Sequence, residues 1–251
     1  MTARVASARP APAVTPGNLT RMTGPHFTLA YVPGATPGKW ARIWGERRPE
    51  VPLDLVQVPP GEAEATVRDR TADAALLRLP IDRTGLHAIP LYTEATVIVV
   101  PKDHLFAAAD EVTPGDLTDE VLLHPQDDTL DWPQPPGRPA LERPGTTADA
   151  IELVAAGVGL LVVPQSLARL HHRRDLTYRP LLEAPQSQVA LSWLEEETTD
   201  LMETFIGIVR GRTVNSTRGR PQQEPVKRKK PAKQPRANPP HPRRGKPRRR
   251  S

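Results

Sequence analysis

The stretch that most constrains the fold is residues 145–170, GTTADAIELVAAGVGLLVVPQSLARL. Apolar side chains recur at helical spacing between Ala148 and Ala156, which predicts a helix with one buried face. Thr146 or Thr147 is suited to cap its N-terminus, and the glycine after Ala156 is suited to end it. The first half of the stretch is therefore a helix with defined ends.

A buried strand and a second helix follow in the same stretch. Residues 159–164 form a continuous apolar run that is too short for a helix and apolar on both faces, as expected for a parallel strand covered on both sides. Pro164 ends this strand, and Ser166 is interpreted as the cap of the next helix. The whole stretch thus predicts one αβα layer unit.

The rest of the chain repeats this alternation of strand and helix. Helices are predicted around Trp40 to Arg47, at residues 62–70, briefly after Asp116, and at residues 198–210. Strands are predicted at residues 27–32, 53–58, 74–79, 86–91, 96–100, 121–124, 176–181 and 189–193. The β-α-β-α-β order at the start predicts a parallel sheet with right-handed crossovers.

Two such αβ units, joined by the strands at residues 96–100 and 189–193, predict a bilobed α/β protein with a cleft. The first subdomain is expected to comprise residues 27–98 with 188–212, and the second residues 99–187. Residues 1–26 and 213–251 are rich in proline and lack apolar periodicity, so both are expected to be disordered.

The net charge of +5 conceals a polarised chain. Residues 218–251 contain 14 lysines and arginines against the single acid Glu224, a charge of +13 that leaves −8 for residues 1–217. Such a tail predicts salt-sensitive binding of nucleic acid without sequence preference, because it offers charge but no aromatic platform. The tail residues assigned to this binding are Lys227, Arg228, Lys229, Lys230, Arg243, Arg244, Arg248, Arg249 and Arg250.

The composition also indicates the cellular compartment in which the protein is expected. The chain has no cysteine, which excludes disulfides and thiolate chemistry and permits a reducing cytosol. The first 25 residues lack the apolar core of a signal peptide, and no apolar run approaches the length of a membrane span. A cytoplasmic protein without a membrane partner is expected.

Signals for catalysis, metals and cofactors are weak. Ser166 stands in PQSLA and not in a nucleophile elbow, and the adjacent His171 and His172 point about 100° apart on a helix. Asp127, Asp128 and Asp131 lack the glycine and glutamate of a calcium loop, which favours a solvated loop. We therefore expect a protein that is not an enzyme and needs no cofactor or metal.

Four motifs, in order, carry a family resemblance. They are PEVPLDL at residues 49–55, RTADAA at residues 70–75, VVPKDH at residues 99–104, and LVAAGVG at residues 153–159 running on to a proline. With these motifs the chain resembles the effector-binding domain of LysR-type transcriptional regulators over residues 27–210. The resemblance implies a periplasmic-binding-protein-like fold, a small-molecule effector, transcription regulation and a homodimer.

The departures from the family pattern qualify these expectations. Only 26 residues precede the first strand, so no winged helix-turn-helix is expected, and without its linker helix the dimer should be weak. That dimer would use the helices that start near Trp40 and Ser166. Position 34, where many relatives carry a Ser or Thr that binds a ligand carboxylate, is Gly, and Leu105 replaces a proline.

One pocket is predicted where the strands end, suited to a small organic anion. Arg78 lies at the end of an apolar strand and needs a partner, either a structural ion pair or a ligand. Trp132 is either a lid of the cleft or a surface anchor. The residues expected to bind the ligand are Gly34, Ala35, Thr36, Pro60, Gly61, Arg78, Trp132, Thr146 and Thr147.

The sequence leaves three functions open. The first is a ligand-sensing module of the LysR type, and the second is a nucleic-acid-associated protein acting through the basic tail. The third, with least support, is an enzyme on the same scaffold. The fold alone cannot separate them.

Overall fold

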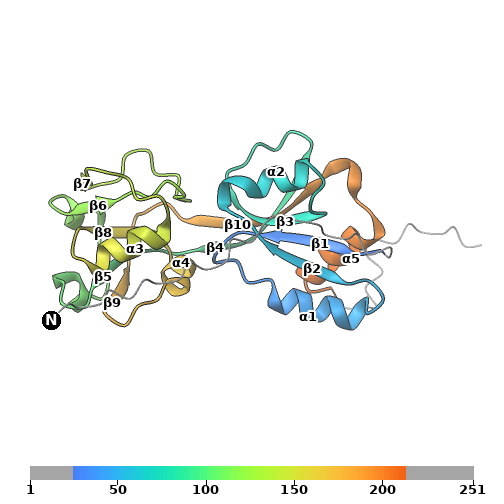
Figure 1. Cartoon of the computed structure of the whole chain (residues 1–251), viewed down its shortest axis with the longest axis horizontal. Coiled ribbons are helices and arrows are strands. Elements are labelled where there is room, and N and C mark those ends of the chain that lie inside the picture. The colour runs from blue at the N-terminus through green and yellow to red at the C-terminus, as the bar shows by residue number, and fades with distance from the viewer. Residues whose placement is uncertain (1–24, 213–251) are drawn as a thin grey trace, which may run out of the picture. The chain divides into compact units, whose positions relative to one another are not determined.

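The computed structural model describes residues 25–212, and the tail predictions lie outside these residues. The described chain forms two five-stranded sheets with helices, which confirms the predicted bilobed α/β fold (Figure 1). We call the part built on the first sheet the first lobe and the part built on the second sheet the second lobe. No helix within residues 25–212 has the length and apolar character needed to cross a membrane.

The first lobe has the strand order β2-β1-β3-β10-β4. Strands β1, β2 and β3 are parallel, as predicted, whereas β10 runs antiparallel to both β3 and β4. The strands are β1 (Phe27–Tyr31), β2 (Leu53–Gln57), β3 (Ala74–Leu79), β4 (Leu86–Glu94) and β10 (Ser187–Leu194). Its helices are α1 (Gly38–Arg47), α2 (Ala63–Arg68) and α5 (Asp200–Val209), with the short 3-10 turns η1 (Pro60–Glu62) and η4 (Glu195–Glu197).

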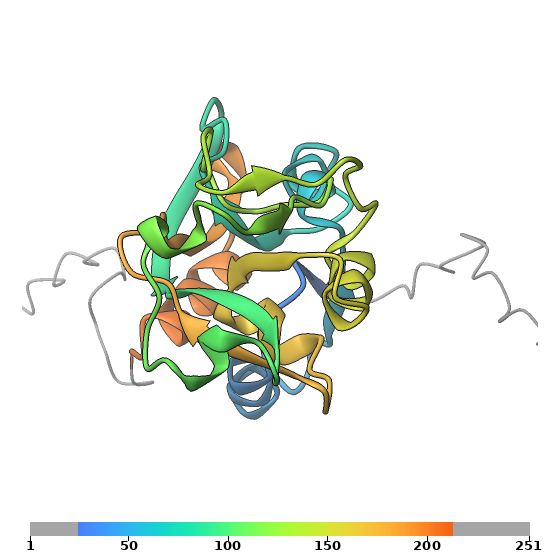
Figure 2. The same cartoon turned by 90° about the vertical axis from the view of Figure 1, so that its left-hand side faces the viewer.

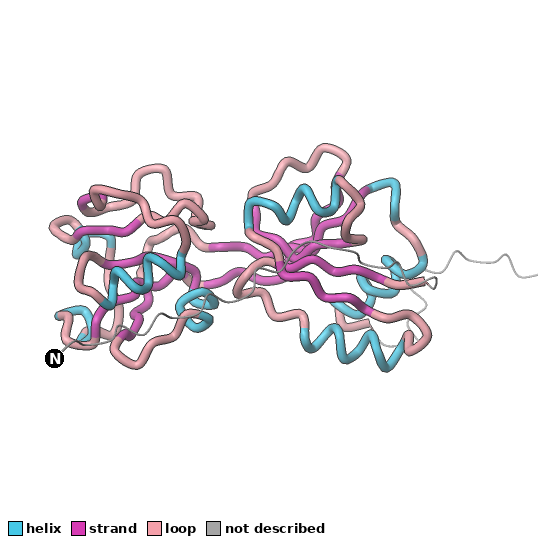
Figure 3. The backbone as a smooth tube through the Cα atoms, in the orientation of Figure 1, coloured by secondary structure: helices cyan, strands magenta, loops and turns pink. Residues whose placement is uncertain are grey.

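The second lobe has the strand order β7-β6-β8-β5-β9. Strand β8 is parallel to β6 but antiparallel to β5, so the sheet is mixed. The strands are β5 (Thr96–Pro101), β6 (Val121–Leu123), β7 (Arg138–Pro139), β8 (Leu160–Pro164) and β9 (Leu176–Pro180). The helices are α3 (Thr147–Ala155) and α4 (Gln165–Leu170), with the turns η2 (Leu105–Ala108) and η3 (Pro114–Leu117), and Figure 3 separates all these elements by type.

The chain changes lobe between strands and not within them. Strand β4 is three residues longer than predicted and ends at Glu94, and β5, which begins at Thr96, pairs only with strands of the second sheet. The return lies between Pro180 and Ser187, and β10 pairs only with strands of the first sheet. The strands expected to cross between the lobes therefore each belong to one sheet, because each completes its hydrogen bonds there.

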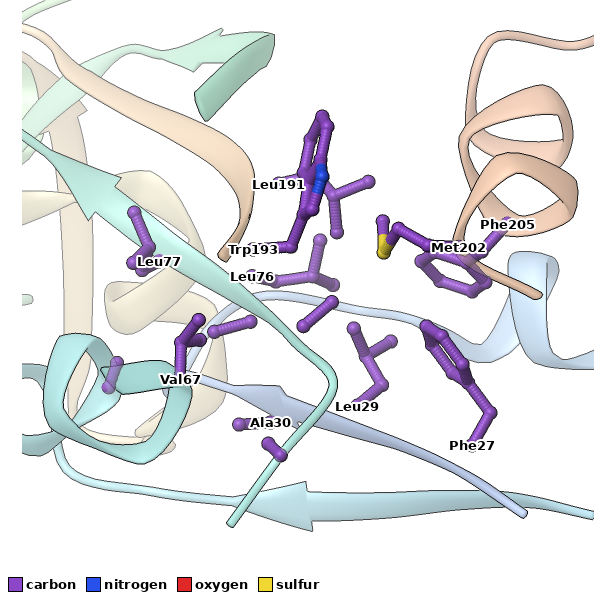
Figure 4. Close-up of a cluster of buried hydrophobic side chains, with 14 of the residues drawn as sticks. Phe27, Leu29, Ala30, Val67, Leu76, Leu77, Leu191, Trp193, Met202 and Phe205 are labelled. Carbon is purple, nitrogen blue, oxygen red and sulfur yellow. The ribbon is translucent and has the colours of Figure 1, made fainter. Parts of the chain in front are cut away.

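The first lobe is held by one continuous core around an aromatic group (Figure 4). The ring of Phe27 lies 4.9 Å from that of Trp44 and 5.3 Å from that of Phe205. The buried indole Nε1 of Trp44 donates to the carbonyl of Val51 at 2.8 Å, so the tryptophan is buried without an unsatisfied donor. This core fixes α1 and α5 against the sheet.

The second lobe has two clusters, one on each face of its sheet. Val97 and Val99 of β5 pack with α3 and α4, whereas Ile98 and Val100 pack with side chains from η2 and η3. In Figure 2, which turns this sheet toward the reader, α3 and the segment carrying η2 and η3 lie on opposite sides of it. The alternation of a strand's side chains explains the two clusters.

Candidate functional site

A pocket lies where β1 and β2 end, beside the end of β4 and helix α4. Its volume is about 640 Å³. The parallel strands β1 and β2 end at the same edge of their sheet, which places Tyr31 and Gln57 in the lining. The other polar or small lining residues are Gly34, Ala35, Thr36, Tyr92, Thr93, Glu94, Ala95, Gln165, Ser166 and Arg169.

A buried ion pair lies at one wall of this pocket, where Glu94 belongs to the lining and Arg78 stands behind it. Arg78 Nη1 lies 2.6 Å from Glu94 Oε2, and the two side chains are only 4% and 11% exposed. Arg78 Nη1 also donates to Ser187 Oγ at 2.7 Å. A buried charge is tolerated only when it is paired and hydrogen-bonded, so Arg78 and Glu94 depend on each other.

Ser166 joins this ion pair from the second lobe. Its hydroxyl donates to Glu94 Oε2 at 3.0 Å and accepts from Arg78 Nη2 at 3.1 Å. The prediction that Ser166 caps a helix is wrong. The N-cap of α4 is Pro164 and no side chain caps that helix, because the Ser166 hydroxyl is turned toward the ion pair of the first lobe.

Gly34 permits this close approach. Its φ is +85°, in the left-handed region that favours glycine. A Cβ at this position would lie 2.4 Å from Ser166 Oγ and 3.0 Å from Arg78 Nη2. Any larger residue at position 34 would therefore collide with the Ser166 hydroxyl.

Two further side chains give the pocket its chemistry. Burial raises the pKa of Tyr92, and the negative charge of Glu94 adds to this shift, so its phenol remains a hydrogen-bond donor at neutral pH. Arg169 is exposed, and its Nε donates to the Tyr178 hydroxyl at 3.2 Å. Among residues 25–212, Arg169 forms no ion pair, whereas the charge of Arg78 is already matched by Glu94.

The structure gathers only part of the predicted site into this pocket. Gly34, Ala35 and Thr36 line it. Arg78 stands behind the lining, with its guanidinium bonded to Glu94. Pro60 and Gly61 open the turn η1 and do not line the pocket, because η1 carries the chain on into α2.

The predicted residues of the second lobe lie elsewhere. Trp132 packs on the core cluster of β5 and η3 and lines a separate pocket of about 240 Å³ with Leu122 and Val162. Thr146 caps α3, as predicted for this position, by accepting from the Asp149 N–H at 3.1 Å. Thr147 is buried and donates to Asp127 at 2.9 Å. Each of these side chains packs on or hydrogen-bonds with residues of the second lobe.

Several lining residues were missed from the sequence. Tyr31 and Gln57 end parallel strands, so the rule that ligands bind at the carboxyl ends of strands could have identified them. Tyr92 and Glu94 belong to the part of β4 that extends beyond the prediction. No sequence signal pointed to Ser166 or Arg169, because both enter the pocket through the packing of the second lobe.

The structure shows no metal-ligand cluster among the described residues. Asp127 and Asp128 are engaged with protein groups, and the predicted solvated loop is wrong for them. Asp128 Oδ2 lies 3.0 Å from His124 Nε2, and Asp128 also accepts from the N–H of Leu130. Burial raises the pKa of the Asp128 carboxyl.

Comparisons with known proteins agree on a family. The protein-family model described as LysR substrate binding domain matches residues 34–213 of this chain. The probable hydrogen peroxide-inducible genes activator of Mycobacterium avium is 33% identical over 153 residues, 57% of this chain and 49% of that protein. The Hca operon transcriptional activator HcaR of Escherichia coli is 23% identical over 205 residues, 76% of this chain and 69% of that protein.

The chain thus spans about half the length of the Mycobacterium relative and about two thirds that of HcaR. Among solved structures, the reduced form of OxyR superposes with a TM-score of 0.63 at 20% identity, covering 76% of this chain and 97% of that one. The BenM effector binding domain with its effector benzoate gives 0.62 at 19% identity, covering 74% and 90%. Because the family model matches most of the chain, the protein belongs to the LysR substrate-binding-domain family.

Proposed function

We propose that the protein senses a small organic effector in the pocket between β1, β4 and α4, and that occupancy of this pocket modulates transcription. One observation carries the proposal: in a LysR-family domain, one pocket of about 640 Å³ takes its lining from elements of both lobes. A ligand in such a position contacts both lobes and so favours one arrangement of them over another. The structure of the BenM effector binding domain with its effector benzoate supports the same use of the fold.

We further infer that the effector carries an acidic group. The Arg78 charge is already paired with Glu94, so Arg169 is the lining cation left to attract an anion. Tyr31, Gln57, Thr36 and Gln165 supply hydrogen-bonding side chains nearby. This set suits a small organic acid with further polar groups.

The test is a thermal-shift screen of organic acids and their neutral amides against the whole chain. An effector at about 100 times its Kd should add about 2.7 kcal/mol of stability. Arg169→Met should weaken binding of the best acid by about tenfold, which corresponds to about 1.4 kcal/mol. Arg174→Met, on an exposed arginine outside the pocket lining, serves as the matched control. The proposal fails if no acid binds or if both variants bind equally well.

We also infer a binding role without catalysis and a cytoplasmic location. The Mycobacterium relative and HcaR are both named as activators of genes, which supports this inference. A weak homodimer would use the helices α1 and α4. Sedimentation of the whole chain at increasing concentration tests the dimer, and a strict monomer at high concentration contradicts it.

A second function rests on the basic tail. Residues 218–251 carry a charge of +13, which favours binding to nucleic acid or another polyanion without sequence preference. Deleting residues 218–251 should abolish salt-sensitive binding to a random duplex. Unchanged affinity after deletion, or affinity that ignores salt, would exclude this function.

A further inference from the structure

Glu94 lies within a set of donors that is suited to a bound carboxylate. Its Oε2 accepts from Arg78 Nη1 at 2.6 Å and from Ser166 Oγ at 3.0 Å. A guanidinium joined by a hydroxyl is a common way for proteins to hold the carboxylate of a ligand. Here the carboxylate belongs to the chain itself, and it lines the pocket that we assign to the effector.

The burial of this pair separates it from the surface ion pairs of the same protein. Arg42 and Glu46 also meet at 2.6 Å, but their side chains are 67% and 59% exposed. Arg78 and Glu94 are 4% and 11% exposed, so solvent screens their charges far less. A second carboxylate brought to Arg78 would meet the charge of Glu94 in this poorly screened site.

The absence of a side chain at Gly34 leaves room for the Ser166 hydroxyl beside Arg78. A side chain at position 34 would displace Ser166 Oγ, which is 2.4 Å from the position of a Cβ there. A hydroxyl side chain on the loop after β1 and the hydroxyl of Ser166 therefore exclude each other. In this chain the hydroxyl comes from α4, and it is bonded to Glu94.

We propose that Glu94 fills, from within the chain, the carboxylate position of the Arg78–Ser166 site, so that this end of the pocket accepts a hydrogen-bond donor from the effector and rejects a carboxylate. This inference rests on the proposed function, and it specifies which polar group of the ligand faces each end of the pocket. The acidic group lies toward Arg169, and a hydroxyl, amide or ammonium group lies toward Glu94. Glu94 is then a specificity-determining residue.

The test removes the internal carboxylate and offers one from solution. Glu94→Ala, in the whole chain, should bind propionate or benzoate at least about tenfold more tightly than the wild type does, because Arg78 is left without its counter-charge. Propionamide and benzamide, at matched ionic strength, should show no such gain. Titration calorimetry and the melting temperature measure both effects.

Two control variants test whether the gain in carboxylate affinity depends on the buried ion pair. Adding Arg78→Met to Glu94→Ala should remove the gain, because the cation is lost with the acid. Glu46→Ala breaks an exposed ion pair of the same length and should gain nothing. A folded Glu94→Ala variant that binds carboxylates no better than the wild type overturns the proposal, as does a gain that persists in the double variant.

Loss of one partner of a buried ion pair can also unfold a protein. If Glu94→Ala does not fold alone, propionate should restore its circular dichroism and propionamide should not, and failure of propionate also overturns the proposal. These outcomes do not depend on the natural effector. The screen of the wild type can therefore fail while the Glu94→Ala result stands, and the reverse also holds.

Discussion

The two lobes bury their sheets in different ways. The first lobe gathers a few large rings from distant parts of the chain, with Phe27 from β1, Trp44 from α1 and Phe205 from α5 in one cluster. The second lobe relies on smaller aliphatic side chains, divided between the two faces of β5. One of those faces is covered by helices and the other by 3-10 turns and loops.

The difference indicates where each lobe is sensitive. Each ring in the first lobe touches several elements, so removing one leaves a large cavity that the rigid surroundings cannot close. On the loop-covered face of the second lobe, we expect the chain to move inward when a side chain is removed. The first lobe should therefore be less tolerant of truncation than the second.

The largest expected effect compares two phenylalanines. Phe205→Ala should cost about 5 kcal/mol, whereas Phe106→Ala, beneath the turn η2, should cost closer to about 3 kcal/mol because the turn can settle into the space. Urea unfolding of both variants provides the measurement. Equal losses would show that the loop-covered face is as rigid as the aromatic cluster.

A smaller effect compares two helix caps. Thr199 caps α5 in the first lobe with one bond to the N–H of Met202, and Thr146 caps α3 in the second lobe within a reciprocal pair with Asp149. Thr199→Ala should cost about 1 kcal/mol and Thr146→Ala somewhat more, because the Thr146 hydroxyl makes two bonds, accepting from the Asp149 N–H and donating to the Asp149 carboxylate. If thermal unfolding ranks the two variants in the opposite order, packing of α5 on the aromatic cluster outweighs the caps.

The smallest effect concerns pH within the second lobe. Burial raises the folded-state pKa of Asp128, so the stability linked to this group is complete below about pH 3.8 and is lost as pH rises through the raised value. Asp128→Asn should therefore gain stability relative to the wild type between pH 4 and pH 7. Urea unfolding at both pH values measures the change.

Asp116 is the matched control, because its pKa shifts the other way. The hydroxyl and the N–H of Thr113 lower the pKa of Asp116, so its contribution is present above about pH 3.8 and is lost as pH falls through the lowered value. Asp116→Asn should be less stable than the wild type at pH 7, with a difference that shrinks in acid. The same sign of change in both variants would contradict these assignments.

The sequence by itself determined the layers of the fold. Apolar periodicity, caps and glycines located the helices and most strands, because hydrogen bonds within a segment and one buried face depend on neighbours close in sequence. The loop of Gly34, Ala35 and Thr36 was found in the same way, since it follows directly from the end of a parallel strand. Four ordered motifs added the family, which the family model then confirmed.

Only the tertiary structure decided the chemistry of the pocket. Arg78 finds its partners 16, 88 and 109 residues away, at Glu94, Ser166 and Ser187, and no local pattern encodes such pairings. Trp132 and Thr147, which the sequence placed in the cleft, are instead bound within their own lobe. A side chain's partner depends on which surfaces the packed sheets bring together, and the alternation of residues along a strand does not contain that information.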